Sequence, residues 1–160
     1  MPPVNSAEEV LQIRETADRV LASRHAEILA TVQAAIAEVL GCEVEEVKPN
    51  SSLMADLHAE SLDFLDLLFR LESAFGIKIP RGGIQKATQG SLKESEFQQN
   101  GVLTEAALER LRLLMPEVDP QRLHPGLTSR EIPALFTAET FTRLVAWRLG
   151  DGEAAKAQVG

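Results

Sequence analysis

Apolar residues recur every three or four positions through the first forty residues, a spacing that predicts helices. One run begins near Ser6, and a second extends from about Ala26 to Leu40, where Gly41 occupies the position expected just after a helix. Only the polar residues 23–25 separate the two runs, and none of them is a strong helix breaker. The pattern therefore leaves open whether the two runs form one helix.

A long polar connection leads from these runs to the most apolar segment of the chain. Four apolar residues are expected to pin the connection to a core: Val44, Val47, Leu53 and Leu57. The segment Ser61–Phe75 then predicts a helix that is apolar on nearly every side, with Gly76 at its end. Such a helix is either buried on most sides or keeps an apolar face for a partner.

The clearest helix start lies near the C-terminus. Thr137 is the predicted N-cap, and Phe136 and Phe141 flank it at the spacing of a hydrophobic staple. Gly150 is the predicted end of this helix, because glycine commonly follows the last helical residue. Residues 151–160 are predicted to form a disordered tail.

The stretch between Pro80 and this last helix has a different composition. Glycines and polar residues up to Gly101 indicate a loop, and Thr104 to Met115 predicts one short helix with an apolar face. Four prolines then limit regular structure. No segment shows a convincing β alternation, so we predict an all-α bundle. It has a helical extension at 1–24, a main domain at 25–150 and an insertion at about 81–133.

The charge of the chain narrows the classes of function. With 160 residues, a net charge of −8 and a pI near 4.9, the protein is expected to repel nucleic acids and to attract basic protein partners. No segment has the pattern of a signal peptide or a membrane span, so we expect a cytoplasmic protein without membrane insertion. The single cysteine, Cys42, reads as a small buried side chain, and the three histidines lack the spacing of a metal site.

One motif points to a specific chemistry. Residues 56–63 read Asp-Leu-His-Ala-Glu-Ser-Leu-Asp, and after the apolar helix residues 75–80 read Phe-Gly-Ile-Lys-Ile-Pro. This combination resembles the acyl carrier protein family, in which a D-L-G-A-D-S-L-D type motif places a modified serine at the start of the second helix. The resemblance covers Ala26–Pro80 well and Thr137–Leu149 loosely. It implies an acyl-carrier-like four-helix bundle and a monomeric carrier, not an enzyme.

The resemblance assigns the central role to Ser61. This serine would carry a covalent 4'-phosphopantetheine arm, which holds acyl groups as thioesters and delivers them to other enzymes. The implied partners are a phosphopantetheinyl transferase and acyl-loading, ketosynthase or acyltransferase enzymes. Serine at a helix start is often only an N-cap, but a phosphodiester built there would also face unpaired backbone N–H groups and the positive end of the helix dipole.

Further residues receive roles around this serine. We expect partner contacts from acidic residues near the attachment point and, by the resemblance, from two apolar residues on the same helix: Asp56, Glu60, Asp63, Asp66, Leu62 and Phe69. The remaining core positions could part to shelter an acyl chain, as helices of such carriers do: Ile28, Val32, Ile36, Leu65, Leu68, Leu71 and Phe75.

Departures from the family pattern favour a specialised member. Glu60 replaces the common Asp, His58 stands where Gly is common, and Arg70 adds a cation to a face that is usually acidic or neutral. With the insertion, these changes favour a carrier of a dedicated lipid or related acyl pathway over the general carrier of fatty acid biosynthesis. A catalytic triad of Ser61, His58 and Asp56 is disfavoured because the three residues are too close in sequence. The main alternative is an unmodified acidic adaptor that only binds partners.

Overall fold

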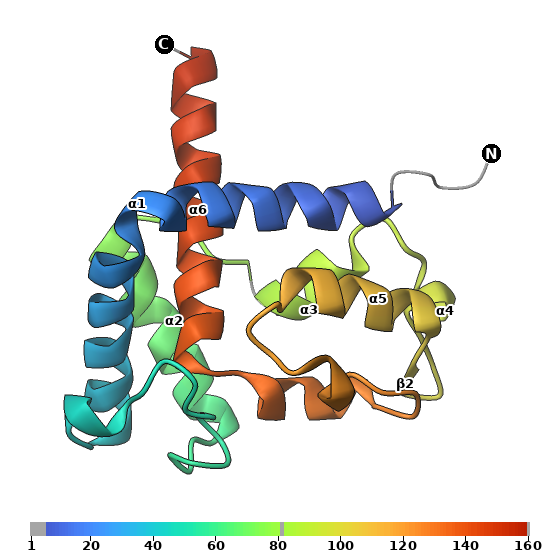
Figure 1. Ribbon diagram of the computed structural model, residues 1–160, viewed down its shortest axis with the longest axis horizontal. Helices are drawn as coiled ribbons and strands as arrows, with labels where there is room; N and C mark the ends of the chain where they lie inside the picture. Colours follow the sequence, from blue (N-terminus) through green and yellow to red (C-terminus); the bar gives the residue numbers. More distant parts are fainter. Residues whose placement is uncertain (1–5, 81, 160) are drawn as a thin grey trace. The chain divides into compact units, whose positions relative to one another are not determined.

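A computed structural model of the chain describes residues 6–80 and 82–159 (Figure 1). The α-helices are α1 (Ser6–Leu40), α2 (Ser61–Phe75), α3 (Gly83–Gln89), α4 (Glu94–Phe97), α5 (Glu105–Leu114) and α6 (Ala138–Val159). Short 3-10 helices occupy Val44–Glu46, Pro120–Arg122 and Ser129–Leu135, and two short strands, β1 (Gln98–Gln99) and β2 (Val102–Leu103), pair antiparallel. The fold is thus mostly helical, as predicted, and the two runs at the start of the chain form one helix.

The described residues divide into two compact units. The core unit contains Thr16–Ile79 and the chain from Phe136 onward, and the insertion unit contains Pro80–Leu135 with the part of α1 up to Glu15. The unit boundary in α1 therefore falls earlier than the domain boundary predicted at residue 24.

The core unit packs α1, α2 and α6 around apolar side chains. Its fully buried residues include Ile28, Val32 and Ile36 from α1, with Leu67 and Leu71 from α2. Of the four predicted pins in the connection, Val47 and Leu53 are buried and Leu57 is half-buried. Val44 is 41% exposed, so the prediction was wrong for this residue, which lies on a single 3-10 turn with no buried side chain.

The start of α6 is the one that the sequence predicts. The Thr137 hydroxyl accepts a hydrogen bond from Thr140 N at 3.2 Å, and the rings of Phe136 and Phe141 meet edge to face at a centroid distance of 5.7 Å. Phe64 of α2 stacks on Phe141 at 6.0 Å, so the staple also joins α2 to α6. Local capping chemistry and tertiary packing agree at this helix start.

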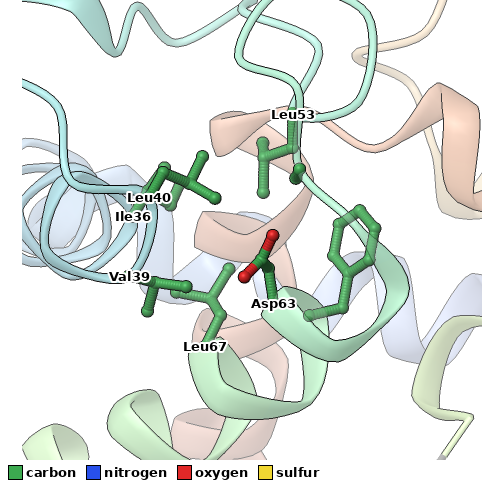
Figure 2. A pocket seen from close by; sticks show the side chains of 8 residues that line it. Ile36, Val39, Leu40, Leu53, Asp63 and Leu67 are labelled. Atoms are coloured by element: carbon green, nitrogen blue, oxygen red, sulfur yellow. The ribbon is translucent and has the colours of Figure 1, made fainter.

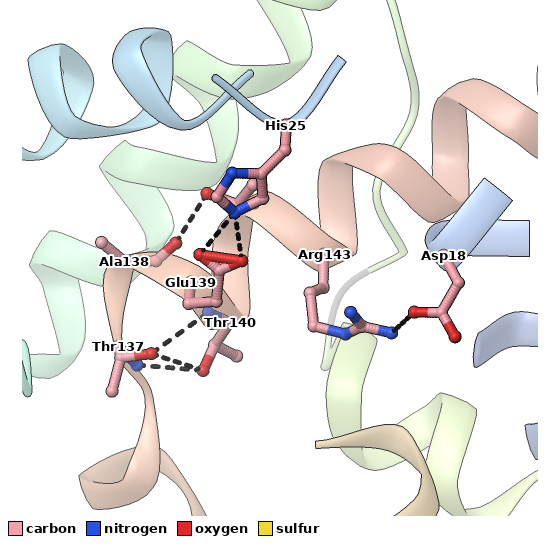
Figure 3. A network of polar contacts seen from close by, with 8 residues as sticks. Asp18, His25, Thr137, Ala138, Glu139, Thr140 and Arg143 are labelled. Atoms are coloured by element: carbon pink, nitrogen blue, oxygen red, sulfur yellow. Dashed lines mark hydrogen bonds and ion pairs between the residues drawn. The ribbon is translucent and has the colours of Figure 1, made fainter. Parts of the chain in front are cut away.

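Polar side chains tie α1 to α6 along the same region (Figure 3). His25 Nε2 lies 2.6 Å from Glu139 Oε1, and Arg143 donates to Asp18 Oδ1 at 2.7 Å. Glu139 also donates its backbone N–H to the Pro49 carbonyl, which fixes the connection before α2 against the start of α6. His25, one of the three histidines without metal-site spacing, therefore pairs with a carboxylate of α6.

The end predicted for α6 was wrong, because the helix continues through Gly150 to Val159. The region from Asp151, predicted as a disordered tail, is helical as far as Val159. Gly150 serves close packing instead: a Cβ atom there would stand 2.4 Å from Thr16 Cγ2 and 3.1 Å from Val20 Cγ2. The absence of a side chain lets α1 approach α6, a reason that local sequence signals do not reveal.

The insertion unit contains more regular structure than its composition suggests. The predicted helix after Thr104 is confirmed as α5, and Thr104 Oγ1 accepts from Ala107 N at 3.2 Å. The loop predicted up to Gly101 was wrong, because α3, α4 and a hairpin occupy it. Asn100 and Gly101 form the hairpin turn with φ angles of 55° and 83°, the backbone that an Asn-Gly pair favours between two strands.

A buried arginine joins the two sequence segments of the insertion unit. Arg110 of α5 is 3% exposed and donates to the Thr88 carbonyl at 2.9 Å and to Glu9 Oε2 at 3.3 Å. Ser91 donates to the same Glu9 oxygen through its backbone N–H and its hydroxyl. The start of α1 is therefore bound to the insertion by its charge as well as by its apolar face.

Candidate functional site

Ser61 is the first residue of α2, and its side chain is exposed. A tight loop presents it: Asp56 N and Leu57 N both donate to the Ser52 carbonyl, at 2.9 and 3.2 Å, and Ala59 N donates to the Leu53 carbonyl at 2.8 Å. Because Ala59 is buried, the loop is fixed two residues before the serine. The hydroxyl thus projects from a held helix start and is accessible to an enzyme.

The N-cap of α2 is Glu60, one residue before the serine. Glu60 N donates to Asp63 Oδ2 at 2.8 Å, and Asp63 N donates to the Glu60 carbonyl at 2.9 Å, so these two residues close the first turn. The alternative reading of Ser61 as an N-cap is therefore wrong by one position. Its hydroxyl is not needed for capping, and a phosphate on it would lie at the positive end of α2.

His58 has a backbone conformation that side chains rarely adopt. Its φ angle is 62°, in the left-handed region, and its side chain is exposed. A histidine thus occupies a backbone conformation that glycine adopts without strain. The hydrogen bonds of Leu57 and Ala59 on either side hold His58 in this conformation.

The acidic residues around Ser61 have local partners. Asp56 Oδ2 accepts from Ser52 N at 2.8 Å, and Asp63 accepts from Glu60 N. Asp66 pairs with Arg70 at 3.2 Å, and the same guanidinium reaches Glu38 of α1 at 3.2 Å. The side chains of Asp56, Glu60 and Asp66 are exposed and that of Asp63 is half-buried, so these carboxylates support the helix start while most remain open to solvent.

Three apolar side chains on α2 face solvent. Leu62 is 77% exposed, Phe69 is 51% exposed and Leu65 is 37% exposed. Leu62 and Phe69 are thus accessible, and their role in partner contact stays a prediction. Leu65 is exposed like these two residues, so its predicted place among the interior residues that shelter an acyl chain was wrong.

A small apolar pocket lies beside the start of α2 (Figure 2). It is lined by residues of α1, the connection and α2: Ile36, Val39, Leu40, Leu53, Ala59, Asp63, Phe64 and Leu67. The side chains leave no volume for a water molecule, so the pocket is closed in this state. Figure 2 shows the Asp63 carboxylate among these apolar side chains.

Of the residues predicted to shelter an acyl chain, only Ile36 lines this pocket. Ile28, Val32 and Leu71 are fully buried in the core, and Leu68 and Phe75 are half-buried. The apolar part of the α2 lining comes from Phe64 and Leu67, whose spacing of three residues places them on one helix face. That spacing is visible in the sequence, but an all-round apolar helix offers several such faces.

Most of the net negative charge belongs to the core unit, which carries −6 of −8, and the other −2 comes from residues 1–15. Residues 80–135 contain seven acidic and seven basic side chains and are formally neutral, whereas residues 16–79 and 136–160 contain fourteen acidic and eight basic ones. Basic partners would therefore be attracted to the unit that contains Ser61.

Cys42 does not supply a reactive group near this site. Its side chain is half-buried, and the pKa of its thiol is raised by burial and by the nearby Glu46 and Glu43 carboxylates. The described residues contain no cluster of three or more potential metal ligands. Among the described helices, none combines the length and apolar character that crossing a membrane requires.

Comparison with known proteins agrees with this geometry. Residues 30–99 match the family described as phosphopantetheine attachment site. The chain is 44% identical over 62 residues to an acyl carrier protein of Rubrobacter xylanophilus, which covers 39% of this chain and 76% of that protein. It is also 44% identical over 54 residues to an acyl carrier protein of Thermosynechococcus vestitus, covering 34% of this chain and 67% of that protein.

A third relative is the acyl carrier protein AcpXL of Rhizobium meliloti, 40% identical over 63 residues, with 39% of this chain and 66% of that protein covered. No solved structure matches the chain significantly. The fold is an acyl-carrier-like helical fold with a phosphopantetheine attachment domain, and proteins of this kind are carriers and not catalysts. The chain belongs to the acyl carrier protein family.

Proposed function

We propose that Ser61 is the attachment site of the 4'-phosphopantetheine arm. The observation that carries the proposal is the exposed hydroxyl at the first position of α2, within the matched residues 30–99 and outside the capping interactions of the helix. When attached, the arm supplies a terminal thiol for thioesters. The chain contributes a fixed, accessible position for it.

The attachment step takes place in the transferase. The Ser61 oxygen attacks the phosphorus next to the pantetheine of coenzyme A, the new bond joins oxygen to phosphorus, and the bond to the adenosine bisphosphate leaving group breaks. The proton of the hydroxyl goes to a base of the transferase, because His58 and the nearby carboxylates are not bonded to this hydroxyl in any described contact. The diester charge then lies at the start of α2.

We further propose that the exposed face of α2 guides the partner enzymes. Leu62 and Phe69 offer apolar contact, and Asp56, Glu60, Asp63 and Asp66 offer negative charge around the serine. Acyl chains would enter the interior between α1 and α2, where Ile36 and Leu67 must part because the pocket is closed. The remaining predicted interior residues would line a deeper path only after such an opening.

A dedicated lipid or related acyl pathway is the setting we propose. The departures that support it are His58 with its left-handed backbone, Arg70 with its two carboxylate partners, and the folded insertion unit. Each changes the surface or the size of the carrier while the serine and its helix start stay in place.

Intact mass spectrometry tests the attachment site. The wild type should gain the mass of one phosphopantetheine group with a phosphopantetheinyl transferase and coenzyme A, and Ser61→Ala should gain none. Ser73→Ala, which removes an exposed serine from the same helix, should be modified like the wild type. Because Glu60 caps the helix, Ser61→Ala should change the free energy of unfolding by less than about 0.5 kcal/mol.

Two results would contradict the proposal. Modification of Ser61→Ala would place the arm elsewhere. Failure of the wild type to gain the mass with several competent transferases would favour an unmodified adaptor, for which the acidic and apolar face of α2 would be the binding surface alone.

A further inference from the structure

The exposed face of α2 consists of two adjacent rows. Leu62, Leu65 and Phe69 follow one another at spacings of three and four residues, so they form one apolar row. Asp66 and Arg70 each come one residue after a member of this row and form a charged row beside it. The first member is negative and the second positive, so the sign of the charge changes along the helix.

The positive end of the charged row is held in place by two carboxylates. Arg70 Nε donates to Asp66 Oδ1 at 3.2 Å, and a second guanidinium nitrogen donates to Glu38 Oε2 at 3.2 Å. These bonds use two of the five N–H donors of a guanidinium, which leaves donors for a further carboxylate. The side chain of Arg70 is 43% exposed, so an approaching protein can reach it.

Stability does not explain this arrangement. Side chains of Glu38 and Asp66 are 74% and 53% exposed, and ion pairs between exposed groups contribute only about 0–1 kcal/mol. The physical effect is on the surface field: Arg70 cancels negative charge about 14 Å along α2 from Ser61. A partner that lies along α2 therefore meets acid near the serine and, farther on, a cation flanked by the Asp66 and Glu38 carboxylates.

We infer that Arg70 selects enzymes of mixed charge, which present basic groups to the acidic start of α2 and a carboxylate to Arg70, on either side of an apolar recess for Phe69. Charge complementarity commits the surface to this occupant, because a uniformly basic docking rim would place a cation against Arg70. The apolar row supplies contact area for either kind of enzyme. Arg70 therefore acts as a specificity residue by repelling one class and pairing with the other.

The inference rests on the proposed carrier function and is tested with the phosphopantetheine form of the full chain. The probe is a ketosynthase whose docking rim is lined by lysine and arginine. Its association rate is measured with the wild type, with Arg70→Gln and with Arg70→Glu, at low and at high salt. Arg24→Glu is the matched control, because it has the same net charge as Arg70→Glu, breaks the exposed pair with Glu27 and lies fourteen residues before Glu38 in α1.

Association should become faster by about threefold for Arg70→Gln and by about tenfold for Arg70→Glu, whereas the control should stay near the wild-type rate. High salt should remove the difference. In addition, at least one Lys→Glu or Arg→Glu variant of the ketosynthase rim should bind the wild type faster than it binds Arg70→Glu. Such a variant gives the enzyme a carboxylate that pairs with Arg70 and repels the glutamate of Arg70→Glu.

Equal rates for Arg70→Glu and Arg24→Glu, or a slower rate for Arg70→Glu than for the wild type, would overturn the inference. This failure differs from failure of the carrier function. If the wild type gains no phosphopantetheine, the proposed function is wrong; if it gains the group but Arg70→Glu matches the control, only the role of Arg70 is wrong.

Discussion

Replacing Gly150 by alanine should destabilise the core unit, although alanine is the better helix former. The added methyl group would stand 2.4 Å from Thr16 Cγ2 and 3.1 Å from Val20 Cγ2, and both neighbours are β-branched side chains with little freedom to move away. Overpacking of this kind costs about 1–3 kcal/mol. Higher helix propensity returns up to about 1 kcal/mol, so the net loss should be roughly 0–2 kcal/mol.

Gly152 provides a matched control two residues further along α6. Nothing lies within 4 Å of a Cβ atom at this position, so Gly152→Ala should gain about 0.5–1 kcal/mol from helix propensity alone. The difference between the two variants then isolates the steric cost at about 1–3 kcal/mol. Trp147, the single tryptophan of the chain, lies in α6 and reports unfolding of this helix by fluorescence during urea titration.

The sign of the difference is the decisive result. If Gly150→Ala is as stabilising as Gly152→Ala, then α1 does not approach α6 closely at Thr16. A fall in stability with unchanged phosphopantetheine attachment would instead show that the contact supports the fold and not the site.

Two other residues give predictions of comparable sharpness. His58→Gly should raise the free energy of unfolding of the core unit by about 1 kcal/mol, because glycine removes the cost of the left-handed backbone. The same urea titration measures this change, and no gain would mean that the His58 side chain compensates the cost. Glu9→Gln should weaken amide protection in the insertion unit by hydrogen exchange, since it leaves Arg110 buried without its carboxylate, while Glu8→Gln, at an exposed neighbour, should not. Partial burial alone would raise the pKa of Glu9, but hydrogen bonds from Ser91 and the ion pair with Arg110 leave it below its ordinary value of 4.5. The stabilisation by Glu9 is therefore complete above about pH 5 and is lost as the pH falls through the lowered folded pKa; protection that is independent of pH in this range would contradict this role.

The helix starts were predictable because their causes are local. Thr137 and Thr104 lie within three residues of the N–H groups they cap, and the staple partners Phe136 and Phe141 are equally close in sequence. Ser61 was placed at the correct helix end, yet the cap is Glu60. Both residues are polar and adjacent, and only the hydrogen bond from Glu60 N to Asp63 identifies the cap.

The errors have causes that lie far away in sequence or in an ambiguous pattern. Glycine is a residue type that commonly ends helices, so Gly150 resembles a helix stop in the sequence. Its actual role is to let α6 approach Thr16, which lies more than a hundred residues earlier. In α2 apolar residues lie on nearly every side of the helix, so periodicity does not separate exposed Leu65 from buried Leu67. The hairpin at Asn100-Gly101 was the exception, because its turn signal is local and was outweighed by the polar residues around it.

The N-terminal extension and the insertion, predicted as separate additions to the carrier, form one unit. Val10 is fully buried although it lies far before the carrier motif in the sequence. The neighbouring Glu9 accepts hydrogen bonds from Ser91 and Arg110. An extension that only lengthened α1 would not need a buried valine beside an ion pair. The two segments instead supply complementary halves of one core, and because the insertion itself is formally neutral, most of the net negative charge stays with the unit that presents Ser61. The added unit thus enlarges the carrier while the charge that attracts basic partners remains concentrated around the attachment helix.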